Sequence, residues 1–322
     1  MNDVEVVTAR EVPLGGPRAM TVRRTLPQRH RSLVGAWCFA DHYGPDDVGV
    51  TGGMDVPPHP HTGLQTVSWL FAGEVEHRDS GGVHAVVRPG ELNLMTAGSG
   101  VAHSEVSTPR TSLLHGVQLW VALPDAAREV SRGFEHYVPP VVAVPGGSVR
   151  VLVGSLVGSP AGSLAGSSSP VRTFTPLLGA EVAVEPESEV TLDVDPTYEH
   201  GVLVDRGPVL LDDVKLARAE LGYVDTGAHR LVVGNPGEEP ARVLLLGGQP
   251  FEEPLVMWWN FVGRSHEEIV AFREQWQAES DRFGAVHGYA GATRRLPAPP
   301  LPNARIQARL HPPGPGDRSA WG

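Results

Sequence analysis

The first half of the chain is a series of short apolar runs separated by turn residues. Between Arg23 and about Pro124 these runs are interrupted by Gly, Pro, Asp and Asn at spacings of roughly 8 to 12 residues, the pattern of a β-sandwich or a barrel. The clearest runs are Thr66 to Phe71, His84 to Val87, Leu92 to Thr96 and Gly116 to Leu123. Two glycine-rich segments, Asp79 to Gly82 and Gly98 to Gly100, can take positive φ angles and predict hairpin turns. We therefore predict that this half is built of β-strands.

The second half repeats the pattern. Its strand-like runs are Glu181 to Val184, Glu189 to Val194, Val202 to Val204, Val209 to Leu211, Arg230 to Val233 and Arg242 to Leu246. We place the boundary between the halves near Pro139 to Pro145. The Gly-, Ser- and Pro-rich segment Gly154 to Pro170 has the composition of a flexible linker, and an ordered loop within the second domain is the alternative. The chain is thus predicted to be all-β, with one plan used twice.

After Pro254 the pattern becomes helical. We predict a helix from Ser265 to Gly284, because Ser265 can cap its N-terminus and four apolar residues can share one face. These residues are Ile269, Phe272, Trp276 and Phe283. From Arg294 on, the chain is rich in Pro, Arg and Gly and has little to bury, which predicts either an ordered strap or a disordered tail.

Composition agrees with two domains. A chain of 322 residues and 34.4 kDa can bury two separate cores. Hydrophobic residues make up 41% and charged residues 20%, while 38 Gly and 30 Pro supply turns. We expect one domain at residues 1–140, a second at 141–290 that the helix closes, and a tail at 291–322.

Charge and cysteine content exclude several classes of protein. The formal net charge of −11 argues against direct binding to nucleic acid, because that affinity comes largely from Lys and Arg on phosphates. The single cysteine, Cys38, cannot form an internal disulfide, and no apolar run reaches the roughly 18 residues that span a bilayer. The polar start, Met1 to Val6, lacks the apolar core of a signal peptide. We therefore expect a cytoplasmic monomer that binds neither nucleic acid nor a membrane.

Two short motifs carry the candidate chemistry. Residues two apart on a strand project from the same face, so the imidazoles of His59 and His61 can reach one point. His103 and Glu105 repeat this spacing farther along, with hairpin turns between the two pairs that let one small barrel bring them together. Three neutral nitrogens and one carboxylate oxygen suit a divalent first-row metal, and a six-coordinate ion keeps two positions open. We predict a metal site at these four residues.

The histidine pair alone would be weak evidence. With 14 His in the chain, a chance His-x-His is common, and surface or hydrogen-bonded histidines are the alternative interpretation. The flanking residues decide between the two. They resemble the pirin family of the cupin superfamily in the segments Pro58 to Gly63, Thr66 to Ser68, Met95 to Glu105, Asp41 to Pro45, Gln118 to Val121, Gly247 to Pro254 and Asp281 to Gly284.

The resemblance covers roughly Val22 to Gly284 and implies two tandem cupin (jelly-roll) barrels followed by a short helix. It implies metal in the N-terminal barrel only, at the residues that match His59, His61, His103 and Glu105. The implied ion is Fe(II), although Zn, Ni, Cu or Mn can replace it in a purified sample.

The resemblance implies two alternative functions. Some pirins are flavonol dioxygenases that open quercetin with O2; here the metal would bind the flavonolate and Glu105 would be the catalytic base. Others are iron-dependent partners of transcription factors or metabolic enzymes, in which a change of iron charge would alter a protein interface. One position departs from the family, since Gln65 stands where pirins usually carry Glu. Glutamine cannot act as a base, which argues against a catalytic role there.

The remaining candidates receive structural interpretations. His200 has no partner two residues away and is read as structural, so the second barrel is predicted to lack metal. Asp41 and His42 either orient a metal-bound histidine or stabilise a loop. Hydrogen bonding or packing is assigned to His77, His84, His115, Cys38 and the pair Trp258 and Trp259.

Overall fold

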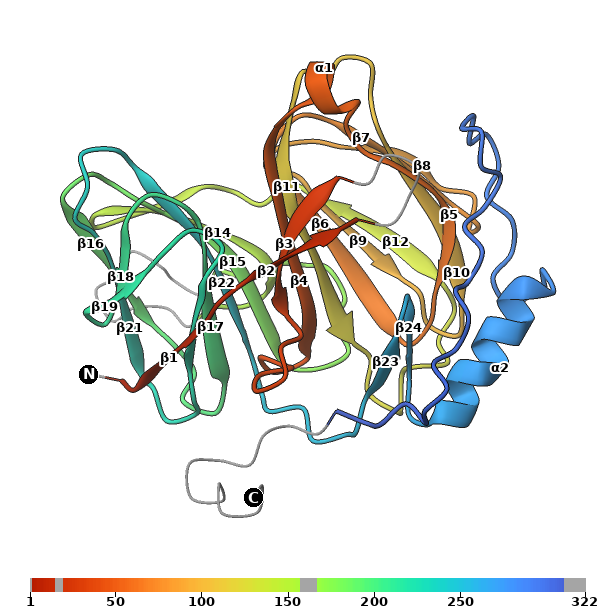
Figure 1. Cartoon of the computed structure of the whole chain (residues 1–322). Coiled ribbons are helices and arrows are strands. Elements are labelled where there is room, and N and C mark those ends of the chain that lie inside the picture. The colour runs from red at the N-terminus through yellow and green to blue at the C-terminus, as the bar shows by residue number, and fades with distance from the viewer. Residues whose placement is uncertain (1, 15–19, 157–166, 310–322) are drawn as a thin grey trace.

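The computed structural model describes residues 2–14, 20–156 and 167–309, and it consists of two β-barrels side by side (Figure 1). In the first barrel the smaller sheet has the order β5 (Asp55–His61), β10 (Val101–Ser107), β7 (Val75–Asp79), β8 (His84–Val87). The larger sheet has the order β12 (Gly133–Tyr137), β9 (Leu92–Thr96), β6 (Leu64–Ala72), β11 (Leu113–Ala122), β4 (Trp37–Asp47), β3 (Thr21–Leu26), β2 (Arg10–Pro13). A single helical turn, α1 (Val48–Thr51), follows β4.

The second barrel repeats this architecture. Its larger sheet has the order β1 (Val4–Val7), β20 (Leu221–Val224), β17 (Glu199–Arg206), β22 (Ala241–Gly248), β15 (Leu177–Val184), β14 (Gly147–Gly154), β13 (Val142–Val144). Its smaller sheet has the order β16 (Ser188–Asp193), β21 (Arg230–Asn235), β18 (Val209–Leu211), β19 (Val214–Leu216). The prediction of an all-β protein with two tandem cupin barrels and a short C-terminal helix is confirmed.

The two barrels share one core because their larger sheets pack against each other. On β17, Val202 and Val204 face the interior of the second barrel, whereas Leu203 belongs to the cluster between the barrels. Trp37 of β4 crosses this interface, and its indole N–H donates to the carbonyl oxygen of Leu178 at 3.0 Å. A strand buried on both faces reads as a continuous apolar run, which explains the sequence at Val202 to Val204.

Each end of the chain crosses to the other barrel. Near the N-terminus, β1 pairs with β20 of the second barrel. After β22 the chain returns to the first barrel as a hairpin of β23 (Val256–Trp258) and β24 (Phe261–Gly263), and Phe261 forms a bridge with Thr62. The N-terminal strand therefore belongs to the second barrel, and the C-terminal hairpin packs on the first.

The predicted helix is α2 (His266–Gln277), capped by the side chain of Ser265, which accepts from the amide of Glu268. It ends before the predicted Gly284, because the backbone reverses at Glu279 with a φ of 52°. Its buried face packs with Phe261 and with Ala102 of β10. Contrary to our expectation, α2 lies against the first barrel (Figure 1) and does not close the second, because β23 and β24 carry the chain back first.

Two further segments differ from a simple reading of composition. Strands β14 and β15, which flank the segment Gly154 to Pro170, are neighbours in one sheet, so the domain boundary does not fall between them. Residues 157–166 of the predicted linker lie outside the described part. Of the predicted tail, residues up to 309 run along the first barrel, and Arg309 forms a bridge with Leu255. Among the described residues, no helix is long and apolar enough to cross a membrane.

Candidate metal centre

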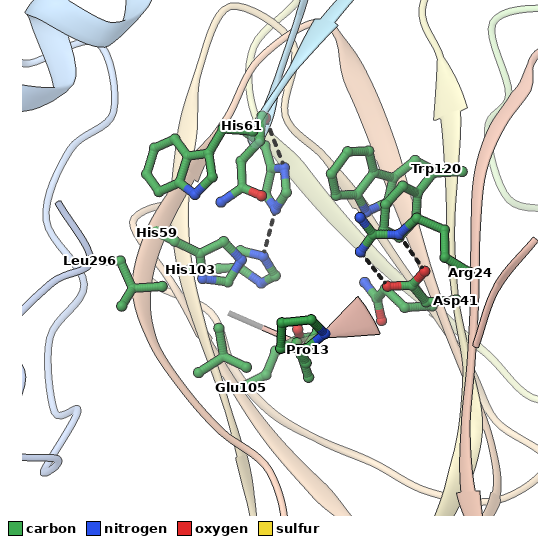
Figure 2. A pocket seen from close by; sticks show the side chains of 15 residues that line it. Pro13, Arg24, Asp41, His59, His61, His103, Glu105, Trp120 and Leu296 are labelled. Carbon is green, nitrogen blue, oxygen red and sulfur yellow. Dashed lines mark hydrogen bonds and ion pairs between the residues drawn. The ribbon is translucent and has the colours of Figure 1, made fainter. Parts of the chain in front are cut away.

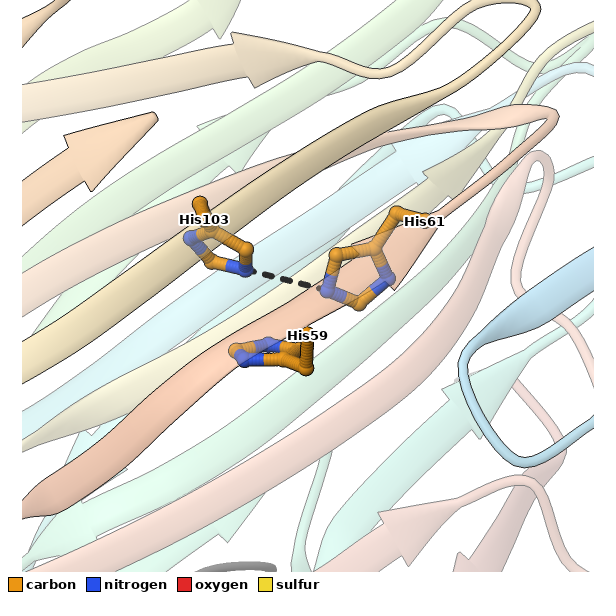
Figure 3. Close-up of side chains that lie close together, drawn as sticks. All are labelled: His59, His61 and His103. Atoms are coloured by element: carbon orange, nitrogen blue, oxygen red, sulfur yellow. Dashed lines mark hydrogen bonds between the residues drawn. The ribbon is translucent and has the colours of Figure 1, made fainter. Parts of the chain in front are cut away.

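Two adjacent strands bring the histidines together. His59 and His61 share one face of β5, and the antiparallel register with β10 sets His103 directly opposite His59. A register irregularity between His103 and Glu105 follows. Figure 3 shows the three imidazoles converging from these strands. Glu105 lines the same cavity as all three histidines.

Backbone carbonyls orient two of the imidazoles. Nδ1 of His59 lies 2.9 Å from the carbonyl oxygen of Pro57, and Nδ1 of His61 lies 3.1 Å from that of Asn260. A carbonyl only accepts, so each Nδ1 carries the proton and each Nε2 keeps a lone pair. Asn260 belongs to the turn between β23 and β24, far away in sequence. Gly63 lets strand β24, which follows this turn, lie close to β5. A side chain at Gly63 would meet the carbonyl oxygen of Val262 in β24 at 2.5 Å.

A second histidine and an aspartate orient His103. Nε2 of His77 lies 3.2 Å from the carboxylate of Asp79, and Nδ1 of His77 lies 3.4 Å from Nδ1 of His103. If Asp79 accepts from His77, then His77 can accept from Nδ1 of His103, which frees Nε2 of His103 for a ligand. His77 could itself join a cluster with His103 and Glu105, but its two ring nitrogens already face Asp79 and His103. Sequence reasoning missed the roles of His77 and Asp79; their spacing of two residues on one strand was the available signal.

The geometry of the nitrogens fits a divalent cation. Nε2 of His61 lies 3.0 Å from Nε2 of His103, so two lone pairs would face each other without a proton or cation between them. Two nitrogens that bind one ion at right angles with bonds of about 2.1 Å are separated by roughly 3 Å. Burial lowers the pKa of His59 to about 4 and holds those of His61 and His103 well below the usual value. The imidazoles are therefore neutral, as metal ligands must be.

Glu105 completes the donor set as a buried carboxyl group. Burial raises its pKa, against smaller opposing effects of His77 and Ser68. The Ser68 hydroxyl lies 3.4 Å from a Glu105 carboxylate oxygen and 2.9 Å from the side-chain oxygen of Gln118. A carboxyl group with a raised pKa binds a proton more readily than an exposed one does, and a cation beside it would favour the charged form.

A cavity of about 330 Å³ opens above these four residues (Figure 2). One wall is aromatic, because the rings of Phe39 and Trp120 stack with centroids 4.0 Å apart. Beside it, Arg24 forms a bidentate ion pair with Asp41, with two bonds of 2.7 Å. The cavity is lined by Pro13, Leu14, Arg24, Phe39, Asp41, Val56, His59, His61, His103, Glu105, Gln118, Trp120, Trp259, Asn260 and Leu296.

Consecutive residues of β4 face opposite sides of the sheet. Asp41 faces the cavity, where burial raises its pKa against the effect of Arg24. His42 faces the second barrel, where Nε2 lies 2.8 Å from an Asp205 carboxylate oxygen. The hydrogen bonds of Asp41 and His42 go to Arg24 and Asp205, and not to an imidazole of the candidate metal site, so these two residues do not orient a metal-bound histidine.

His42, His115 and Asp205 form a second buried cluster between the barrels. Nε2 of His115 lies 2.6 Å from the oxygen of Asp205 that also contacts His42. Arg242 donates to the other oxygen at 2.8 and 2.7 Å. Burial opposes ionisation of Asp205, but its bonds to both histidines and the Arg242 charge together hold its pKa below the usual value.

Further guanidinium groups surround this second cluster. Arg23 lies 3.4 Å from Nδ1 of His42, and Arg218 lies 3.4 Å from Nε2 of His115. Both arginines also donate to the carbonyl oxygen of Gly44. Guanidinium groups this close to the histidines would repel a metal ion. The cluster is therefore better described as a set of ion pairs that holds the two barrels together.

Other candidates lie away from the cavity or contribute to it unexpectedly. Gln65 donates to the Thr96 hydroxyl at 2.9 Å and the Arg172 carbonyl at 3.0 Å, and it does not line the cavity. Trp259, which the sequence assigned to packing, does line it. His84 is exposed and bonds Glu76.

Two remaining candidates are buried single groups. Cys38 is buried, which raises the pKa of its thiol to about 12. His200 is fully buried in the second barrel, and its ring nitrogens have no hydrogen-bond partner among the described residues. Burial lowers the pKa of His200 to about 4, against the effect of Asp195. Neither group belongs to a cluster of candidate metal ligands in the described part of the chain.

Comparison with known proteins agrees with this architecture. The pirin family model matches residues 19–121, and that of the pirin C-terminal cupin domain matches residues 179–284. A Pseudomonas aeruginosa protein, whose name gives it provisionally as a quercetin 2,3-dioxygenase, is 43% identical over 92% of this chain and 90% of its own length. A Caulobacter vibrioides pirin-like protein is 35% identical over 85% of this chain and 92% of its own length. The crystal structure of a quercetin 2,3-dioxygenase from Acinetobacter baumannii superposes with a TM-score of 0.86 at 37% identity, covering 95% of this chain and 97% of that one. This chain therefore belongs to the pirin family.

Proposed function

We propose that this protein binds one divalent metal ion, Fe(II) in the working state, through His59, His61, His103 and Glu105, and that it opens a flavonol with O2. One observation carries the proposal: three neutral imidazoles and a carboxyl group meet at a cavity with an aromatic wall. The named activities of the Pseudomonas and Acinetobacter relatives support the choice of substrate. The open positions of such an ion suit a substrate that chelates through two oxygens.

The protein's own residues would hold and prepare the substrate. Phe39, Trp120 and Trp259 line the cavity and offer apolar contact to an aromatic ligand. The metal, when bound, would supply positive charge to a phenolate and the redox chemistry that O2 needs. Glu105 is the carboxyl group that would take the substrate's hydroxyl proton, and the Ser68 hydroxyl lies 3.4 Å from it.

The test starts without oxygen. Fe(II)-loaded protein is incubated anaerobically with quercetin, and O2 is then admitted. We expect the flavonol absorbance band to decay and carbon monoxide to be released. A protein shown by elemental analysis to contain iron that gives neither signal would refute the dioxygenase proposal.

Matched variants separate the site from the barrel. His103→Ala should abolish turnover, whereas His84→Ala should leave it unchanged, because His84 is an exposed histidine of the same barrel. Repeating the reaction with Fe(II), Mn(II), Ni(II), Cu(II) and Zn(II) identifies the working ion, since affinity order alone does not select iron. Equal activity with all five ions would contradict the assignment to iron.

A further inference from the structure

Residues from segments near both ends of the chain line the cavity at positions that solvent can reach, and we call this side of the cavity its mouth. Pro13 and Leu14 line it from the N-terminal side, and Leu296 lines it from the C-terminal side. We call residues 285–309 the strap. The strap lies outside both ranges matched by the family models, 19–121 and 179–284. Figure 2 shows Leu296 beside His59 and His103.

The main chain of Leu296 is fixed on two sides. Its amide donates to the carbonyl oxygen of Pro58 at 2.9 Å, and Pro58 directly precedes His59. Its carbonyl oxygen accepts from the indole of Trp276 at 2.8 Å. Leu296 is therefore held between strand β5 and helix α2, at a set position relative to a candidate metal ligand.

Neighbouring residues of the strap are fastened to the end of α2. The guanidinium of Arg295 donates to the carbonyl oxygens of Trp276 at 2.8 Å and Gln277 at 3.0 Å. Carbonyls in the last helical turn lack partners within the helix, and a cation there also complements the helix dipole. Arg295 also lies over the Trp276 ring, 4.7 Å from its centroid. The amide of Ala298 donates to the Gln277 side chain at 2.9 Å.

The side chain of Leu296 makes this part of the mouth apolar. Leu296 and Leu14 both pack against the buried cluster that contains Met54 and Val56. The polar pair Arg24 and Asp41 also lines the cavity. An aliphatic chain with a fixed backbone restricts the width of the entrance without attracting charge.

We propose that Leu296 is a specificity-determining residue, which restricts access to the metal cluster to narrow, flat aromatic chelators. This inference rests on the proposed metal site but not on turnover. A bulky ligand with the same donor atoms is excluded by the leucine side chain, and the bonds from Arg295 to α2 keep that side chain in place.

The test compares two chelators that share their donor atoms. Iron(II)-loaded protein is mixed anaerobically with phenanthroline or with its wider diphenyl derivative, bathophenanthroline, and the coloured iron complex is followed over time. In Leu296→Ala the wide chelator should remove iron about tenfold faster, while the rate with phenanthroline changes less than about twofold. Arg295→Gln should likewise speed iron removal by the wide chelator more than removal by phenanthroline. Equal acceleration with both chelators, or none, overturns the proposal.

Two control variants lie on the same strap. Leu301→Ala removes an apolar side chain that packs with the α2 cluster and does not line the cavity. Arg305→Gln removes a guanidinium that pairs only with exposed Glu267 in the described contacts. Neither should change the ratio of the two rates. A change as large as that of Leu296→Ala would mean that general loosening of the strap, and not the leucine side chain, sets access.

A second readout does not depend on iron. Quenching of tryptophan fluorescence reports flavonol binding, because Trp120 and Trp259 line the cavity. With metal-free protein, Leu296→Ala should tighten binding of a flavonol glucoside relative to the free flavonol by about tenfold. An unchanged ratio would refute the role of Leu296, whether or not the protein binds iron or turns over quercetin.

Discussion

The candidate metal site, with His59, His61 and His103, and the inter-barrel cluster, with His42, His115 and Asp205, contain similar residues in different surroundings. In the first, Nε2 atoms of His61 and His103 face each other at 3.0 Å beside an open cavity. In the second, His42 and His115 both contact one oxygen of Asp205. Both clusters are buried, and each offers three ligand atoms within 4.8 Å of one another.

The difference lies in which atoms have partners. Asp205 is saturated, because two histidines contact one oxygen and Arg242 donates to the other. Its histidines also lie near Arg23 and Arg218. In the candidate metal site, by contrast, the backbone carbonyls that contact His59 and His61 lie at Nδ1 and leave Nε2 available. A set of histidines and a carboxylate thus suits a cation only when its acceptor atoms converge without donors around them.

The largest expected effect is on metal content. After loading with Fe(II) and removal of free metal, elemental analysis should find one iron per chain in the wild type and in His115→Ala. His61→Ala should retain less than about a tenth of this, because losing one of four ligands weakens binding severely. Two ions per chain in the wild type, or loss of iron in His115→Ala, would show that the inter-barrel cluster also binds metal.

A smaller effect is expected on stability. Asp205→Ala should lower the free energy of unfolding by about 3 kcal/mol, because it leaves two buried histidines and the half-buried Arg242 without their shared anion. Urea titration followed by circular dichroism measures this. Glu238→Ala, which removes an exposed carboxylate of the same barrel, should change stability by less than about 0.5 kcal/mol. An equal loss of unfolding free energy in the two variants would contradict the stabilising role of the Asp205 ion pairs.

The smallest expected effect is the pH dependence of the stability that the Asp205 cluster provides. The pKa of Asp205 is held below the unfolded value, so its stabilisation is present above a pH of about 4 and is lost as the pH falls below that. Burial lowers the pKa of His42, against the effect of Asp205, so the unfolded chain takes up that proton first below a pH of about 6.5. Both effects make acid destabilising.

Urea titrations at several pH values check this sign. The difference in unfolding free energy between the wild type and Asp205→Asn should shrink as the pH falls through 4 and below. A difference that grows on acidification would mean that Asp205 is protonated in the folded protein at higher pH, contrary to its saturation by donors.

Much of the fold could be predicted from the sequence. Periodic apolar runs indicated the strands of both barrels, and the residues around His59 and His103 identified the family. Spacing of two residues also indicated that His59 and His61 share a face, which the register of β5 and β10 bears out geometrically. That these residues bind metal stays a prediction. Strand geometry is local, so the sequence carries these features directly.

Contacts between distant segments could not be predicted. The carbonyl of Asn260 orients His61, and Leu296 borders the cavity only because β23, β24 and α2 return to the first barrel. Composition likewise could not show that Gln65 bonds the Arg172 carbonyl and lies away from the cavity.

The sequence by itself determined the all-β plan, the two barrels and the residue types of the candidate site. Only the tertiary structure decided which histidines keep a free lone pair and which are clamped to Asp205, and which side chains border the entrance. The physical reason is that a side chain's chemistry depends on the donors and charges around it, and here these come from segments far apart along the chain.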